Sequence, residues 1–293
     1  MTPKISPAQR DATAAFRALH ESGCFILPNP WDAGSTVYLQ SLGFKALATT
    51  SAGAAFADAR SDDPGAMPLE ETLAHIALIV RSTSLPVNAD FQSGHANDPE
   101  QLAANVQRCL ETGVAGLSIE DNSGDDAHPL FAREIAIERM KAARAAIDDS
   151  SSGAVLTGRC EAWLVDAPDP LRVALDRLVA YAEAGADCLY APGVSDPKEI
   201  AEIVRAVAPK PVNVLVSRPH PELTFAHLRD LGVRRISVGS ALALAAWGGF
   251  LRAARKLAES NSFEGFAENA AYGELNDFFR ARRLDAALKK GET

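Results

Sequence analysis

The stretch Glu183-Ala184-Gly185-Ala186-Asp187-Cys188-Leu189-Tyr190-Ala191-Pro192 joins the end of a predicted helix to a short apolar strand. Gly185 stands where that helix should end, because glycine adopts the left-handed conformation of a helix C-terminus at little cost. After the strand, Asp196-Pro197-Lys198-Glu199 offers an N-cap Asp, a proline in the first turn and a Glu that closes a capping box. This stretch therefore predicts one strand–helix unit.

The same unit recurs along the chain. Helix starts of this type also occur at Ser6-Pro7-Ala8-Gln9 and Asp98-Pro99-Glu100-Gln101. Short apolar runs that end in polar residues predict eight strands, at 24–29, 46–50, 86–90, 116–120, 154–159, 188–192, 211–215 and 235–239. Eight repeats favour an α/β fold closed into a (β/α)8 TIM barrel, with an open doubly wound sheet as the alternative. No Gly-x-Gly-x-x-Gly follows the first strand, which disfavours dinucleotide binding.

Length and composition limit the class of protein. The chain has 293 residues, 47% of them hydrophobic and 23% charged, which suits a globular protein with a large core. We interpret 1–293 as a single barrel domain, with the barrel over about 22–258 and a C-terminal helical extension over about 259–293. The Ala/Leu-rich extension predicts additional helices.

Charge and cysteine usage exclude several partners. The net charge is −9 and no segment clusters basic and aromatic residues, so we expect no nucleic-acid partner. No apolar run reaches the roughly 20 residues that cross a bilayer, and the first residues do not resemble a signal peptide, so we expect no membrane partner and a cytoplasmic location. The four cysteines and six histidines show no zinc-ligand spacing.

Several carboxylates follow the predicted strands, at the end of a barrel where active sites lie. Asp90 ends the third strand, Glu120 with Asp121 ends the fourth, and Asp62 with Asp63 lies in the loop after the second. Arg159 is the obvious cationic partner among the strand ends. More acids than bases favour a hard divalent cation, Mg²⁺ with Mn²⁺ as a substitute, because Mg²⁺ needs only one or two carboxylates. The alternative is that these acids are solvated or cap helices.

Smaller signals surround these acids. Thr49-Thr50-Ser51-Ala52-Gly53 follows the second strand with small residues that let backbone N–H groups approach an oxyanion, although such turns also serve packing. Tyr190, Asn213, Trp31 and Asp32 also follow strands, and they either line the pocket or have structural roles.

Six phrases in order resemble the isocitrate lyase/phosphoenolpyruvate mutase superfamily, and the resemblance runs from about Phe16 to Ala254. The phrases are Asn29-Pro30-Trp31-Asp32-Ala33-Gly34-Ser35, Thr49-Thr50-Ser51-Ala52-Gly53, Ala89-Asp90, Ser118-Ile119-Glu120-Asp121, Glu183-Ala184-Gly185-Ala186-Asp187 and Gly232-Val233-Arg234-Arg235-Ile236-Ser237-Val238-Gly239. The resemblance implies Mg²⁺-dependent making or breaking of C–C or P–C bonds next to a 2-oxo acid.

The resemblance also implies roles for particular residues. Asp90 and Glu120 match the metal-binding acids, and Asp62 matches the acid of the loop after the second strand, with Asp63 as the alternative. The segment Ser51-Ala52-Gly53 matches a backbone cradle for the substrate carboxylate or keto oxygen. Arg159 matches the arginine that binds a substrate carboxylate or phosphonate; its alternative is a salt bridge with Glu161 or Glu120.

Two departures from the family pattern narrow the expected reaction. Family members commonly have Asp-x-Asp-x-Gly-Tyr-Gly at the third strand, whereas here Asn88 replaces the first Asp, so we expect Asn88 to hold a metal-bound water at a weaker metal site. The loop after Glu120 has neither the Lys-(Lys/Arg)-Cys-Gly-His motif of the isocitrate and methylisocitrate lyases nor the Lys of the mutases. Asn122 and His128 are its candidate catalytic residues, with Asp125-Asp126 as an alternative acid and an exposed position as the alternative for His128.

The combined expectation is a Mg²⁺-dependent carbon–carbon lyase that performs retro-aldol-type cleavage or decarboxylation on a small 2-oxo or 2-hydroxy di- or tricarboxylic acid. The alternatives are P–C chemistry on phosphonopyruvate and a non-catalytic 2-oxo acid binder. Because superfamily members commonly exchange the C-terminal barrel helix between subunits, the resemblance also implies a homodimer or homotetramer, with helices swapped between subunits.

Overall fold

The computed structural model describes residues 5–290, with side chains described as far as residue 282. Its contacts divide the described chain into two compact units, 5–243 and 244–290. The first unit holds every strand and the predicted site, and the second is helical.

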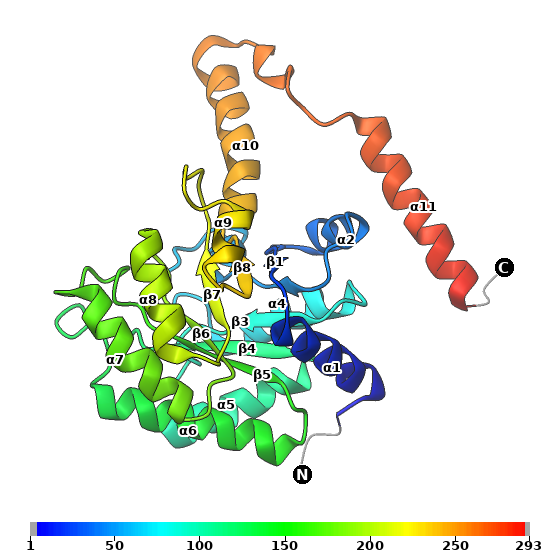
Figure 1. Ribbon diagram of the computed structural model, residues 1–293. Helices are drawn as coiled ribbons and strands as arrows, with labels where there is room; N and C mark the ends of the chain where they lie inside the picture. Colours follow the sequence, from blue (N-terminus) through cyan, green and yellow to red (C-terminus); the bar gives the residue numbers. More distant parts are fainter. Residues whose placement is uncertain (1–4, 291–293) are drawn as a thin grey trace. The chain divides into compact units, whose positions relative to one another are not determined.

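The first unit is an eight-stranded parallel sheet in the order β1-β8-β7-β6-β5-β4-β3-β2 (Figure 1). The backbone N–H of Ala48 donates to the carbonyl of Pro28, which joins the ends of the sheet into a nearly closed barrel. Every predicted strand is present; β4 has the predicted bounds, and the other strands are shorter than the sequence indicated. The strands are β1 Phe25–Leu27, β2 Leu47–Ala48, β3 Val87–Asp90, β4 Gly116–Glu120, β5 Val155–Arg159, β6 Cys188–Tyr190, β7 Val212–Leu215 and β8 Arg235–Ser237. The predicted (β/α)8 fold is confirmed.

Helices alternate with these strands, and their first turns are capped as the sequence predicts. The side chains of Ser6, Asp98 and Asp196 each accept a hydrogen bond from a backbone N–H of the helix that follows. The helices of this unit are α1 Pro7–Glu21, α2 Ala33–Ser41, α3 Ser51–Ala57, α4 Leu69–Arg81, α5 Pro99–Glu111, α6 Arg133–Ser150, α7 Pro170–Glu183, α8 Pro197–Val207 and α9 Phe225–Asp230.

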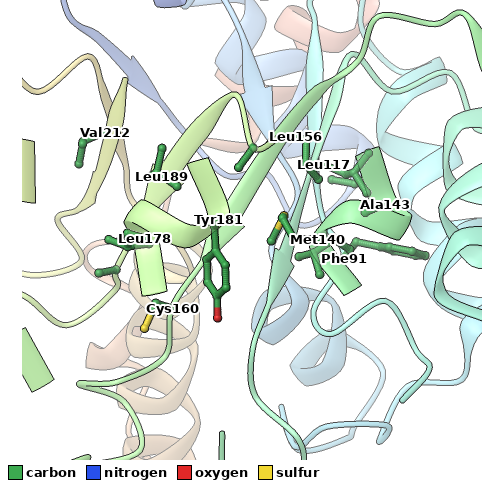
Figure 2. Close-up of a cluster of buried hydrophobic side chains, with 14 of the residues drawn as sticks. Phe91, Leu117, Met140, Ala143, Leu156, Cys160, Leu178, Tyr181, Leu189 and Val212 are labelled. Carbon is green, nitrogen blue, oxygen red and sulfur yellow. The ribbon is translucent and has the colours of Figure 1, made fainter. Parts of the chain in front are cut away.

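The hydrophobic core lies between the outer face of the strands and the surrounding helices. Figure 2 shows Leu117 and Leu156 of β4 and β5 among side chains of α6 and α7 such as Met140 and Leu178, all of them buried. Side chains alternate along a strand, so the residues between these apolar ones face the inside of the barrel. The outer face therefore provides most of the apolar burial, and the inner face is free to carry polar groups.

Strand register brings the polar strand ends together. Glu120 of β4 pairs with Arg159 of β5, Arg159 pairs with Tyr190 of β6, and Asp90 of β3 pairs with Ser118 of β4. The adjacent strands β3 to β6 thus bring polar residues together near the carboxyl end of the barrel.

The second unit contains most of α10, which spans Ala241–Ser260. The short 3-10 helix η1 Glu264–Phe266 and then α11 Tyr272–Lys290 follow it. Its described aromatic side chains are largely exposed: Phe263 is 72% exposed and Tyr272 84%. The predicted domain boundary at about 258–259 and the exchange of a helix between subunits stay predictions. No helix within the described range is long and apolar enough to cross a membrane.

Candidate active site

A single guanidinium organises the carboxyl end of the barrel. Nη1 of Arg159 lies 3.1 Å from Oδ1 of Asp90 and 3.3 Å from Oε2 of Glu120, while Nε donates to Oε1 of Glu161. The guanidinium also lies 5.4 Å from the centroid of the Tyr190 ring, within range of a cation–π interaction. The predicted metal acids Asp90 and Glu120 therefore face the same point, and the salt bridge that we considered as the alternative role of Arg159 is present as well.

Asp90 is fixed from a second direction by the segment after β2. The backbone N–H of Ser51 donates to Oδ2 of Asp90 at 2.9 Å, and the N–H of Asp90 donates to Oγ1 of Thr49 at 2.8 Å. Since Ser51 begins α3, its N–H has no acceptor within the helix and is available to this carboxylate. Both oxygens of Asp90 are thus held before any ligand binds.

Burial and mutual repulsion make the negative charges in this cluster costly. Burial raises the pKa of both Glu120 and Glu161, and Arg159 only partly offsets the effect. Burial and then the charge of Asp90 raise the pKa of Asp62 to about 6, while a hydrogen bond from Ser51 acts the other way. Although burial alone would lower it, Glu161, Glu120 and Asp90 raise the pKa of Arg159. The cluster therefore lacks positive charge.

This shortage of positive charge fits the binding of a divalent cation. Within the described chain, Arg159 is the one basic side chain that forms an ion pair with Asp90, Glu120 or Glu161. No three His, Cys, Asp or Glu side chains of the described residues converge as a complete ligand cage. Mg²⁺ does not need such a cage, because it keeps several waters and is commonly bound by one or two carboxylates. Asp90 and Glu120 would hold it, with Asp62 nearby.

The cluster opens into a cavity of about 180 Å³ inside the barrel, to which Asp62, Asn88, Asp90 and Arg159 contribute. Oδ1 of Asn88 is buried there without a hydrogen-bond partner. An unpaired buried carbonyl oxygen is costly, so it is an available acceptor for a water or a ligand group. The predicted role of Asn88 toward a metal-bound water stays a prediction. Asp63, the alternative to Asp62, accepts from Ser61 and does not line this cavity.

The predicted substrate-binding residues divide into two groups. Ser51, Ala52 and Asn213 line the cavity, but Ser51 already donates to Asp90. Gly53 donates its N–H to Oγ1 of Thr50, and a Cβ at this position would lie 2.6 Å from Cγ2 of the same residue. The Ala52 N–H, in the first helical turn, is the cradle group without an acceptor inside its helix.

Trp31 and Asp32 lie away from the cavity. The carbonyl of Trp31 contacts Nε2 of His75 at 2.8 Å, and Asp32 is the N-cap of α2, where its side chain accepts from the N–H of Ser35. Neither residue lines the cavity, so the structure gives both of them structural contacts.

The loop after β4 bonds to itself. His128 is 84% exposed and its Nδ1 lies 3.5 Å from Oδ2 of Asp125. The side chain of Asn122 accepts from the N–H of Gly124, and its backbone pairs with Leu130. Neither side chain lines the cavity in this conformation.

The sequence analysis did not predict a hydrogen-bond network of Asp121, Tyr181 and Arg177, which lies next to the cluster. Asp121 ends β4 next to Glu120, but its Oδ2 accepts from the hydroxyl of Tyr181 at 2.6 Å and from Arg177 at 3.1 Å. Its Oδ1 accepts from the backbone N–H of Glu161 at 2.8 Å, which positions the acid that binds Arg159. Tyr181 and Arg177 are four residues apart on α7, so helical spacing places them on one face. This four-residue spacing was the signal in the sequence from which the network could have been predicted.

Comparisons with known proteins show the family to which the chain belongs. The model of the family described as phosphoenolpyruvate phosphomutase matches residues 16–258. An uncharacterised protein of Mycobacterium tuberculosis strain H37Rv is 32% identical over 275 residues, which cover 92% of this chain and 96% of the relative. The oxaloacetate decarboxylase of Rhodopseudomonas palustris strain BisB5 is 31% identical over 227 residues, 74% of each chain.

Among solved structures, a lyase/mutase from Burkholderia cenocepacia J2315, whose activity is described as putative, superimposes with a TM-score of 0.88 and 42% identity. The match covers 94% of this chain and 97% of that one. The similarity thus extends over the barrel and beyond it.

Proposed function

This chain is an enzyme of the phosphoenolpyruvate phosphomutase family, within the isocitrate lyase/phosphoenolpyruvate mutase superfamily, and from that premise we propose that it is a Mg²⁺-dependent carbon–carbon lyase. Its proposed substrate is a small 2-oxo or 2-hydroxy di- or tricarboxylic acid. The observation that carries the proposal is the cluster of Asp90, Glu120 and Glu161 around the Arg159 guanidinium, beside a cavity that Asp90 and Arg159 line.

Arg159 and the first turn of α3 would bind the carboxylate end of the substrate. A guanidinium forms paired hydrogen bonds with a carboxylate, and the Ala52 N–H adds a donor for the keto oxygen. Glu161 holds Nε of Arg159, so the side chain is oriented before the substrate arrives.

The reaction class follows from where charge develops. In a retro-aldol cleavage of a 2-hydroxy acid, the hydroxyl carbon becomes the new keto carbon, and the electron pair of the broken C–C bond goes to the other fragment, where a carboxylate stabilises it. In decarboxylation of a 2-oxo acid, the bond to the departing carboxylate breaks and leaves its electron pair on the carbon next to the keto group, so the negative charge spreads to the keto oxygen. Mg²⁺, when bound, supplies a Lewis-acid charge that stabilises this oxygen. Decarboxylation then needs only a proton from solvent, whereas a retro-aldol cleavage also needs a base for the substrate hydroxyl.

We propose that His128, with Asn122 beside it, acts on the substrate when the loop after β4 closes over the cavity. The loop is exposed and its contacts are local, so closure breaks few long-range bonds. Within the loop, Asp125 is the charged partner of His128, with Oδ2 lying 3.5 Å from Nδ1 of the ring.

We also propose a homodimer or homotetramer, built in part by the C-terminal unit. Phe250, Phe263, Phe266 and Tyr272 are exposed, and exposed aromatic clusters are typical of surfaces that bind another chain. A cytoplasmic location remains part of this proposal.

The test is turnover of three substrates with Mg²⁺ or with a chelator. We expect Mg²⁺-dependent cleavage of oxaloacetate or 2-methylisocitrate, measured as release of pyruvate or CO₂, with no loss of phosphonopyruvate. Turnover of phosphonopyruvate alone would replace the proposal with P–C chemistry. Mg²⁺-dependent oxalate binding without any turnover would identify a non-catalytic binder.

A further inference from the structure

A second guanidinium lies deeper in the barrel and has no counterion. Arg235 begins β8 and is 2% exposed, yet it takes part in no ion pair of the described residues. Nε donates to Oδ1 of Asn213 at 3.0 Å, Nη2 donates to Oγ1 of Thr157 at 3.0 Å, and Nη1 lies 3.4 Å from Nε2 of His20. All three contacts are to uncharged groups.

The surroundings of Arg235 do not supply the missing negative charge. Burial and the charge of Arg235 lower the pKa of His20 to about 3, so its ring is neutral. Asp187, whose charge reaches His20, is already paired with Arg17 at 3.1 Å and with Arg144 at 3.0 Å. A buried charge without a partner is costly unless an anion compensates it. Arg235 is therefore an anion-binding group that the protein itself leaves uncompensated.

Arg235 lines the same cavity as the strand-end cluster. A guanidinium has five N–H donors, and its three contacts leave donors for a further acceptor. The other inward residues at this level, Asn88, Ser118 and Asn213, are polar and neutral, so they solvate an anion without repelling it. The cavity therefore has a cationic group at its floor as well as at its mouth.

The two arginines lie at successive levels of the barrel. Thr157, which contacts Arg235, precedes Arg159 by two residues on β5. Because side chains alternate along a strand, Thr157 and Arg159 both face the interior of the barrel. Two residues of a strand span roughly 6.6 Å. A short linear acid with a carboxylate at each end fits this separation, whereas a monocarboxylic acid leaves one arginine unsatisfied.

We propose that Arg235 binds the distal carboxylate of the substrate, and that the enzyme selects dicarboxylic over monocarboxylic 2-oxo and 2-hydroxy acids. This inference rests on the proposed function, because it assumes that Arg159 holds the carboxylate next to the keto or hydroxyl carbon. Arg235 is then a specificity residue, and the contacts of Asn213 and Thr157 orient its guanidinium.

Calorimetry with matched ligands tests the proposal in the presence of Mg²⁺. The pairs are malate with 2-hydroxybutyrate and 2-oxoglutarate with 2-oxovalerate, which differ in a distal carboxylate or methyl group. Oxalate probes the Arg159 end alone. We expect the dicarboxylate of at least one pair to bind about tenfold or more tightly than its partner, since a hydrogen bond to a charged group is worth that much.

In Arg235→Gln we expect this preference to fall below about threefold, with oxalate affinity changed less than about threefold. Arg235→Lys should restore part of the preference because it keeps the charge. The matched control is Arg218→Gln, which removes an exposed cation from a neighbouring cavity and should keep the preference. No preference in the wild type, a preference that survives in Arg235→Gln, or an equal loss in Arg218→Gln would overturn the inference.

A wild-type crystal structure with malate decides the matter if Arg235→Gln does not fold. We expect the distal carboxylate within hydrogen-bond distance of Arg235, and a distal carboxylate placed elsewhere contradicts the inference. If oxalate itself does not bind to the wild type, the proposed function fails instead, so the two failures are distinguishable.

Discussion

The strand-end cluster and the loop after β4 carry the two halves of the proposed chemistry, and they differ in how they are held. Arg159 has a side-chain exposure of 16% and Glu161 of 3%, and their partners come from separate strands and loops. His128 is 84% exposed, and its partner is three residues away. The binding half of the site is therefore preassembled, whereas the proton-transfer half depends on movement of a loop.

The largest effect should come from the cluster. In Asp90→Ala we expect the loss of all Mg²⁺ stimulation, because the substitution removes the carboxylate that both Arg159 and Ser51 hold toward the proposed metal. The measurement is initial rate against Mg²⁺ concentration. Asp230→Ala, which removes an exposed carboxylate on α9, is the control and should keep the wild-type curve. An unchanged Mg²⁺ response in Asp90→Ala would refute the ligand assignment.

A smaller effect is expected from the loop. His128→Ala should lower kcat by about 10²-fold if the loop closes, because this is the usual contribution of a general acid or base. The control is His227→Ala, which changes a half-buried histidine of α9 outside the cavity. A kcat within twofold of wild type would show that solvent supplies the proton and that the loop does not take part.

The pH dependence of Mg²⁺ binding should distinguish the role of the cluster from the role of the loop after β4. Burial raises the pKa of Asp62 to about 6 and raises those of Glu120 and Glu161, so the folded protein binds more protons than the unfolded chain. Without metal, stability should therefore fall as the pH rises from about 4 through 6. Protons compete with Mg²⁺, so its stabilising effect should be small near pH 5 and larger above pH 6.

Melting curves from pH 5 to pH 8 provide the measurement. At a concentration about 100 times its Kd, Mg²⁺ should raise the Tm by roughly 5–10 °C at pH 8. The His128→Ala variant should give the same curves, since that side chain lies outside the cluster. An equal rise at pH 5 and pH 8 would exclude the buried carboxylates as the ligands.

The smallest effect should come from the hydrogen-bond network of Asp121, Tyr181 and Arg177. Tyr181→Phe removes the hydroxyl that donates to Asp121 and should lower the free energy of unfolding by about 1–3 kcal/mol, with Mg²⁺ affinity retained. Chemical denaturation measures the change, and Tyr272→Phe, at an 84% exposed position, should have no effect. A loss of Mg²⁺ affinity larger than the loss of stability would place Asp121 in the binding site itself.

The features that could be predicted from the sequence are those determined by local residue patterns and by the order of the strands. Helix caps such as Asp98 and Asp196 act within a few residues, and parallel strands place Asp90, Glu120 and Arg159 at one end of the barrel. The predicted barrel and the resemblance to the superfamily were both confirmed.

Side-chain partners across the barrel were not predictable in the same way. Asp121 follows Glu120 directly, but adjacent residues of a strand face opposite sides, so one joins Arg159 and the other joins Tyr181. The hydrogen bonds of Arg235 are to Thr157 and Asn213, which are 78 and 22 residues away. Such contacts depend on the closed barrel and carry no local signal.

A crystal structure with Mg²⁺ and oxalate tests the central claim most directly. We predict one ion beside Asp90 and Glu120, with oxalate bound to that ion and to Arg159. An ion at any other place, or oxalate bound with no ion near these two carboxylates, would contradict the account.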